Sequence, residues 1–198
     1  MTITTTPRLP TRADLARRLK TRELDELDIA VHEAAHTVSG ILSGGTLATA
    51  LVTRPGRVVQ HVHGLTKFRN TFDPYAHANV AYCGPWGQAT WLDGLRRPTV
   101  ATVDALLAAG GRCDAAAIDA SGGMRRTIDV PALEHLMGRC WPNVLGLAGQ
   151  LYSRGEITHD DALAALGLSR DNAPMGLACI KAGERPGTFR IHEPHMRF

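Results

Sequence analysis

Apolar and polar positions divide the chain into a series of helical segments around one short strand region. The clearest helical pattern covers Leu24 to Ser43, where apolar residues recur at helical spacing, acidic residues crowd the beginning and Gly44-Gly45 follow the end. Acidic side chains favour the start of a helix because they meet the positive end of its dipole. This pattern predicts a largely buried helix over residues 24–43.

The remaining elements follow from shorter patterns. Leu47–Arg54 and Val58–Lys67 are rich in Val, Leu and Thr and are separated by Pro55-Gly56, which predicts a β-hairpin. Further helices are expected over Tyr75–Leu92, Thr99–Ala108, Asp114–Ser121, Val130–Arg154 and Thr158–Leu166. Pro142 is expected to divide the fourth of these. The predicted fold class is mainly α with a small β-hairpin or sheet.

A chain of 198 residues is long enough for one well-packed domain and short for two. We expect a flexible basic N-terminal arm over residues 1–22, because arginines and lysines cluster there after a threonine- and proline-rich start. The domain itself is expected over residues 23–167. Residues 168–198 carry several prolines and glycines and are expected to form an irregular C-terminal tail.

Composition excludes several classes of protein. The net charge of +3 is too small to indicate a nucleic-acid partner. No apolar run reaches about 18 residues, so we expect no membrane partner, and the start of the chain lacks a secretory signal pattern. These features predict a cytoplasmic protein. Its four cysteines are spread without a C-x-x-C pair and are expected to be reduced thiols: Cys83, Cys113, Cys140 and Cys179.

The candidate chemistry lies inside the first helix. His32-Glu33-Ala34-Ala35-His36 is an H-E-x-x-H sequence, and four residues make slightly more than one helical turn. Both imidazoles therefore leave the same face and can bind one metal ion, while Glu33 can act as the general base beside it. The alternative interpretation is a pair of partly buried, hydrogen-bonded histidines.

Two histidines do not complete a catalytic zinc site, which usually takes three protein ligands. The H-E-x-x-H-x-x-G-x-x-H extension is missing, since Ser39 and Ser43 occupy its glycine and final histidine positions. No glutamate on a later helix is an obvious third ligand, so the aspartates remain. The residues alone do not single out one of them.

Three segments together resemble the peptidase domain of the FtsH family of zinc proteases. Val31-His32-Glu33-Ala34-Ala35-His36-Thr37-Val38 is similar to that family's A-V-H-E-A-G-H-A-V helix. Ala81-Tyr82-Cys83-Gly84-Pro85-Trp86-Gly87-Gln88-Ala89 is similar to its L-x-G-R-A-A-E-E segment. Ala109-Gly110-Gly111-Arg112-Cys113-Asp114-Ala115-Ala116-Ala117 is similar to its G-A-x-x-D-L-x-x-A segment. The resemblance covers roughly residues 24–166.

The resemblance implies a zincin-like fold of the FtsH peptidase-domain type, with Zn²⁺ held by His32, His36 and Asp114. The alternative role for Asp114 is the N-cap of the short helix after it, and the other candidates for the third ligand are Asp93, Asp104 and Asp119. The chain also departs from the family. Ala35 replaces a glycine, Gln88 and Thr90 stand near the positions of acids, and no ATPase module precedes the peptidase-like part.

The leading hypothesis is therefore an ATP-independent zinc metallopeptidase, a hydrolase that acts on a peptide or protein substrate with Glu33 as the catalytic residue. The strand near Val58 to Thr66 is expected to bind an extended substrate at its edge. His61 and His63 share one face of that strand, where they either contact substrate or form ordinary surface. Members of the FtsH family form rings, so the resemblance makes homo-oligomer formation a further expectation.

Two alternatives keep the same residues and change the function. Two histidines and one carboxylate also describe a ferrous site of oxygen-dependent enzymes. A regulatory binding protein with a vestigial site would instead use the basic N-terminal arm to hold its partner.

His192 and His195 lie in the expected C-terminal tail, which is interpreted as a loosely docked terminus. The alternatives are that the two histidines form an additional metal contact or that the tail acts as a self-inhibiting plug.

Overall fold

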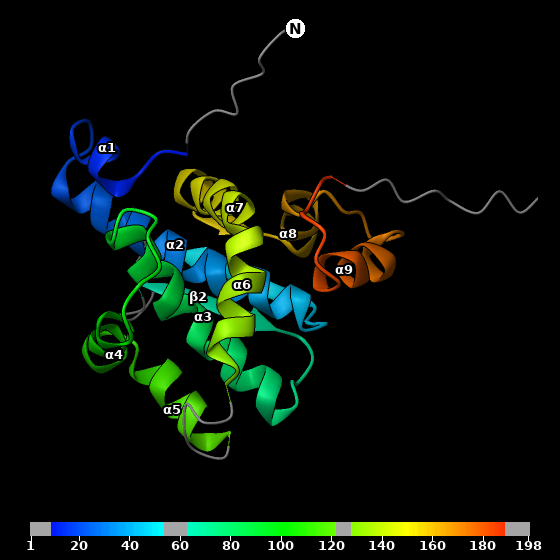
Figure 1. Cartoon of the computed structure of the whole chain (residues 1–198). Helices are drawn as coiled ribbons and strands as arrows, with labels where there is room; N and C mark the ends of the chain where they lie inside the picture. Colours follow the sequence, from blue (N-terminus) through cyan, green and yellow to red (C-terminus); the bar gives the residue numbers. More distant parts are fainter. Residues whose placement is uncertain (1–8, 54–62, 122–127, 189–198) are drawn as a thin grey trace, which may run out of the picture.

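The computed structural model describes residues 9–53, 63–121 and 128–188 and is mainly helical, with a small three-stranded antiparallel sheet (Figure 1). Its helices are α1 (Arg12–Ala16), α2 (Thr21–Leu42), α3 (Pro74–Leu92), α4 (Val100–Ala109), α5 (Arg112–Ala120), α6 (Val130–Arg139), α7 (Trp141–Arg154), α8 (His159–Ala165) and α9 (Ala173–Lys181). Its strands are β1 (Leu47–Val52), β2 (Gly64–Phe68) and β3 (Glu156–Ile157).

Helix α2 is the centre of the structure, because α3, α7 and the sheet all pack against it (Figure 1). Its core face consists of small and β-branched side chains that are fully buried: Ala30, Val31, Ala34, Ala35 and Val38. Small side chains let the axis of α3 come close. At Gly87 of α3, an added Cβ would lie only 2.5 Å from the Cβ of Ala35, so the two helices meet nearly backbone to backbone.

The sheet lies against α2 in the order β2-β1-β3. Strand β1 is the middle strand and pairs antiparallel with both neighbours, for example Ala50 with Thr66 of β2 and with Ile157 of β3. It buries Leu47, Ala50 and Val52. Strand β2 therefore forms one edge of the sheet.

The structure confirms the predicted helical fold class and places helices in every segment where the sequence pattern predicts one. The predicted helix over residues 130–154 is divided, as expected, and the break falls at Cys140, just before Pro142. The hairpin is confirmed as the antiparallel pair β1 and β2, while its turn and the first half of its second strand lie outside the described residues. Among the described helices, none combines the length and apolar content that a bilayer-spanning segment requires.

The expected irregular tail is wrong for residues 173–181, which form α9 with Ile180 fully buried. The prolines misled the prediction, because Pro174 sits in the first turn of α9, where a missing N–H costs nothing. Strand β3 is a two-residue element that no sequence pattern indicated. The rest of the predicted tail, including His192 and His195, lies outside the described residues.

The expected flexible arm is also wrong in its second half. Residues 12–16 form α1, which begins with a capping box between Thr11 and Asp14. The guanidinium of Arg12 donates to both carboxylate oxygens of Asp28 on α2, with N···O distances of 2.9 to 3.1 Å. The arm is thus tied to the core by a bidentate ion pair.

Asp28 also accepts a hydrogen bond from the buried indole N–H of Trp91 on α3, at 2.9 Å. One carboxylate therefore joins α1, α2 and α3, with only 7% of the residue exposed. Arg12 compensates the charge of Asp28, and both carboxylate oxygens of Asp28 accept hydrogen bonds.

We expect Asp28→Ala to lower the free energy of unfolding by about 2–3 kcal/mol, because it leaves the Trp91 N–H buried without an acceptor and unties Arg12. Asp25→Ala, at an exposed site on the same helix, is the matched control and should change stability by less than about 0.5 kcal/mol. Urea unfolding followed by circular dichroism measures both. Equal stability of the two variants would contradict this role for Asp28.

Candidate metal centre

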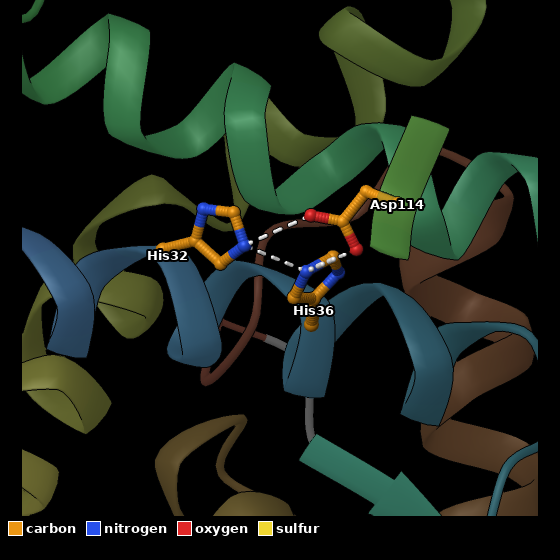
Figure 2. Close-up of side chains that lie close together, drawn as sticks. All are labelled: His32, His36 and Asp114. Atoms are coloured by element: carbon orange, nitrogen blue, oxygen red, sulfur yellow. Dashed lines mark hydrogen bonds and ion pairs between the residues drawn. The ribbon is translucent and has the colours of Figure 1, made fainter. Parts of the chain in front are cut away.

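His32 and His36 lie on one face of α2, as the helical spacing predicts (Figure 2). Their Nε2 atoms are 2.9 Å apart, and their ring planes stand nearly perpendicular, at 78°. Both side chains are mostly buried, with 16% of the His32 and 9% of the His36 side chain exposed. The two Nε2 atoms therefore lie close enough together to bind one metal ion.

Asp114 reaches the same point from α5, which packs on α3 rather than on α2. Its Oδ2 lies 3.2 Å from Nε2 of His32 and its Oδ1 lies 3.2 Å from Nε2 of His36 (Figure 2). Asp114 is the third residue of α5, and Gly111 stands at the N-cap. The alternative prediction of an N-cap role for Asp114 is therefore wrong, because the helix starts two residues earlier than expected.

Each imidazole is held by a partner on α3. Nδ1 of His36 lies 2.7 Å from the carbonyl oxygen of Val80, and Nδ1 of His32 lies 3.2 Å from Oε1 of Gln88. Because a carbonyl oxygen only accepts, the Nδ1–H must donate in each case, which leaves Nε2 free to bind a metal. Helix α3 thus orients both rings.

Space for the rings exists because position 84 of α3 is a glycine. A Cβ added to Gly84 would lie 2.2 Å from Nε2 of His36 and 2.7 Å from Nε2 of His32. Any side chain there would occupy the point where the two nitrogens meet. Gly84 and Gln88 are one helical turn apart, so α3 presents both to the centre.

Charges in the centre stabilise one another. Burial alone would lower the pKa of His36, but the hydrogen bond to Asp114 and the charges of Asp114 and Glu33 outweigh burial and raise the pKa to about 9. Burial alone would raise the pKa of Asp114, but hydrogen bonds to the two histidines outweigh it and hold the pKa well below its usual range. In the metal-free protein, a proton therefore occupies the cluster at neutral pH.

The donor set fits a metal ion. The ligand atoms of His32, His36 and Asp114 all lie within 4.8 Å of one another. Two ligands on one tetrahedral zinc at ordinary bond lengths are about 3.3 Å apart, close to the observed separations. A cation would take the place of the shared proton and would leave the Nδ1 bonds to α3 intact. The three residues can therefore hold a metal ion, although the donor set does not by itself fix which one.

Glu33 lies next to the centre but turns toward the sheet. Its Oε2 accepts a hydrogen bond of 2.6 Å from the hydroxyl of Thr66 on β2, and the residue is 6% exposed. Its Oε1 lies against Gly64, where an added Cβ would be 2.5 Å away. The carboxylate is thus fixed between α2 and the edge strand, with no charge partner of its own in these contacts.

The other candidate residues lie elsewhere. Asp93 is the C-cap of α3, Asp104 belongs to α4, and Asp119 lies more than one turn beyond Asp114 on α5. Within the described residues, none of them joins the group of possible ligands. His63 is exposed directly before β2, and His61 lies outside the described residues.

Sequence reasoning missed the roles of Val80, Gly84 and Thr66. In the sequence, Gln88 stands out only as a departure from the family resemblance, although its spacing of four from Gly84 predicts that both lie on one helical face. The partner of the His36 ring is a backbone carbonyl, which carries no side-chain signal at all.

Within the described residues, no cysteine belongs to the group of possible metal ligands. Cys83 and Cys140 are buried, and burial raises the pKa of the two thiols to about 12 and about 11. All four cysteines are free thiols, as predicted, although Cys113 is exposed.

Comparisons of the chain with known proteins found no match: no protein family matches the chain, and no curated protein matches it.

We expect Asp114→Ala to weaken zinc binding by more than about a hundredfold, because it removes one of three ligands together with the charge that compensates the cation. Asp119→Ala is the matched control on the same helix and should bind zinc like the natural protein. Competition against a chromophoric chelator measures both affinities. Equal affinities would show that Asp114 is not a ligand.

The metal-free protein should lose stability as pH rises. A folded-state pKa of about 9 for His36, above the unfolded value of about 6.5, stabilises the fold fully below pH 6.5, and this contribution is lost as pH rises through 9. We expect the free energy of unfolding to fall by roughly 2–3 kcal/mol between pH 6.5 and 9.5 in chelator-treated protein. His36→Gln should flatten this dependence, and an equally steep profile in that variant would assign it to other groups.

Proposed function

We propose that the protein is a zinc-dependent metallopeptidase that cleaves peptide bonds. One observation carries the proposal: Asp114, distant in sequence, lies within hydrogen-bond distance of both histidines of the H-E-x-x-H helix. Two histidines, one carboxylate and an adjacent glutamate form the set of groups that zinc peptidases use. The resemblance to the FtsH peptidase domain is part of this proposal and rests on the same three segments.

Zinc bound to His32, His36 and Asp114 would supply a Lewis acid that polarises a peptide carbonyl and acidifies water. Glu33 then accepts the proton of the attacking water and later gives it to the leaving amine. Thr66 holds Oε2 of Glu33 on the side of the sheet, so Oε1, which accepts no hydrogen bond from the described residues, is the oxygen that takes the proton in this proposal. Gly64 supports it by leaving room for Oε1.

An extended peptide fits the same region. Strand β2 forms one edge of the sheet and carries both Gly64 and Thr66, so the edge runs past the carboxylate of Glu33. Main-chain groups on a free strand edge recognise an extended segment by strand addition. A peptide added along β2 would bring its backbone to the general base without requiring a particular side chain.

We expect Glu33→Gln to lower kcat/KM for peptide cleavage by roughly 10²–10⁴-fold while zinc binding is retained, because the amide cannot accept the proton yet still accepts the Thr66 hydrogen bond. The measurement uses zinc-loaded protein and a quenched-fluorescence peptide library, with zinc content determined in parallel.

Glu26→Gln, on the same helix, is the matched control and should keep full activity. Unchanged cleavage by Glu33→Gln would remove the proposed role of Glu33. Turnover that depends on ferrous iron and oxygen, with no peptide cleavage by the zinc form, would favour the oxygenase alternative.

A further inference from the structure

A pocket of about 410 Å³ lies on the side of α3 that does not carry Gly84 and Gln88. Its walls come from the end of α3, the turn after it, α6 and the start of α7. His32, Glu33, His36 and Asp114 are not among its lining residues. Its volume lies within the range of small-molecule sites. The pocket is therefore separate from the metal centre, and what it binds does not depend on the proposed peptidase function.

Two tryptophans form the inner wall. Trp86 and Trp141 are 4% and 6% exposed, and their rings meet edge to face with centroids 5.8 Å apart. The indole N–H of each is buried without a hydrogen-bond partner in the part of the chain that the structure describes. Trp91 differs, since its N–H donates to Asp28. A buried donor without an acceptor is costly, so both N–H groups would gain from an acceptor that a ligand brings to this wall.

The turn at the mouth of the pocket is strained. Leu95 adopts a φ of +71°, a conformation that bulky side chains rarely take, directly after Gly94 at the same φ. Its N–H donates to the carbonyl of Thr90 at 2.9 Å, which ends α3. This conformation turns the Leu95 side chain inward as a pocket wall and starts the segment that carries Arg96 and Arg97. Strain of this kind is retained where it places functional groups.

Positive charge exceeds negative charge around the mouth. Arg97 is paired with Glu134 of α6, with an N···O distance of 2.6 Å, so these two charges cancel. Arg96 forms no ion pair within the described residues and lines the same pocket, as does His135. One uncompensated guanidinium beside two indole donors favours a ligand with anionic oxygens.

We propose that this pocket binds a small organic anion, a carboxylate or phosphate carried on an aromatic body. The body packs on the rings of Trp86 and Trp141 and on Leu95. The anionic oxygens accept hydrogen bonds from Arg96 and from the indole N–H groups that lack partners.

The indole N–H signals of the ¹⁵N-labelled full chain test the proposal directly, because the protein has three tryptophans and each gives one signal. The probes are 3-phenylpropionate, phenyl phosphate and the neutral 3-phenylpropionamide. We expect saturable shifts of the Trp86 and Trp141 signals with either anion, while Trp91 stays in place because its N–H is already bonded to Asp28. The tighter anion identifies the preferred acidic group.

Arg96→Gln should weaken binding of the anion by about tenfold or more, the effect of one charge-assisted hydrogen bond. Trp141→Phe keeps an aromatic ring, loses the N–H and should weaken binding several-fold. Arg18→Gln, at an exposed position that does not line the pocket, is the matched control and should bind like the natural protein.

Three results would overturn the proposal. They are the absence of saturable shifts up to 10 mM probe, equal shifts of all three indoles, and equal binding of the propionate and its amide. Unchanged affinity of the Arg96→Gln variant for the anionic probes would likewise overturn the proposal, because Arg96 would then not bind the anionic group. Each result can be read whether or not the protein cleaves peptides.

Discussion

The close packing of α3 against α2 is the contact on which the candidate metal centre depends. Alanines on α2 and glycines on α3 bring the two backbones together, so a main-chain carbonyl of α3 comes within 2.7 Å of the His36 ring. The same approach leaves no room for a side chain at Gly84. Larger residues along this seam would separate the helices, and the imidazoles would lose the partners that fix their Nδ1 atoms.

The buried charges of the centre are tolerated because they compensate one another. Asp114 loses hydration on burial and regains stabilisation from two imidazoles, and His36 keeps its proton to about pH 9 for the same reason. A metal ion would satisfy the same three groups with more charge than the proton supplies. The three groups therefore already lie close together before a cation binds, which lowers the ordering cost of binding.

The predictable parts of this protein are those with a local signal. The periodicity of residues 24–43 indicates α2, and the four-residue spacing of His32 and His36 indicates their shared face. The family resemblance indicates Asp114, whereas elimination among the residue types leaves the aspartates as a class. The link between His32 and Gln88 spans 56 positions and depends on how α3 crosses α2, which periodicity does not encode. Helices α1 and α9 were missed because they are short and begin beside prolines, which were interpreted as breaks.

Helix α3 carries two chemically different faces, and their difference explains why the structure has two separate candidate sites. The face toward α2 is built from Gly84, Gly87 and Gln88, which allow close approach and orient ligands. The face toward α7 carries Trp86, whose ring meets that of Trp141 edge to face and lines the pocket. One helix can serve both purposes because residues four apart share a face while residues two apart do not. The small residues that place the metal ligands and the large residue that lines the pocket are thus set by the same register of α3.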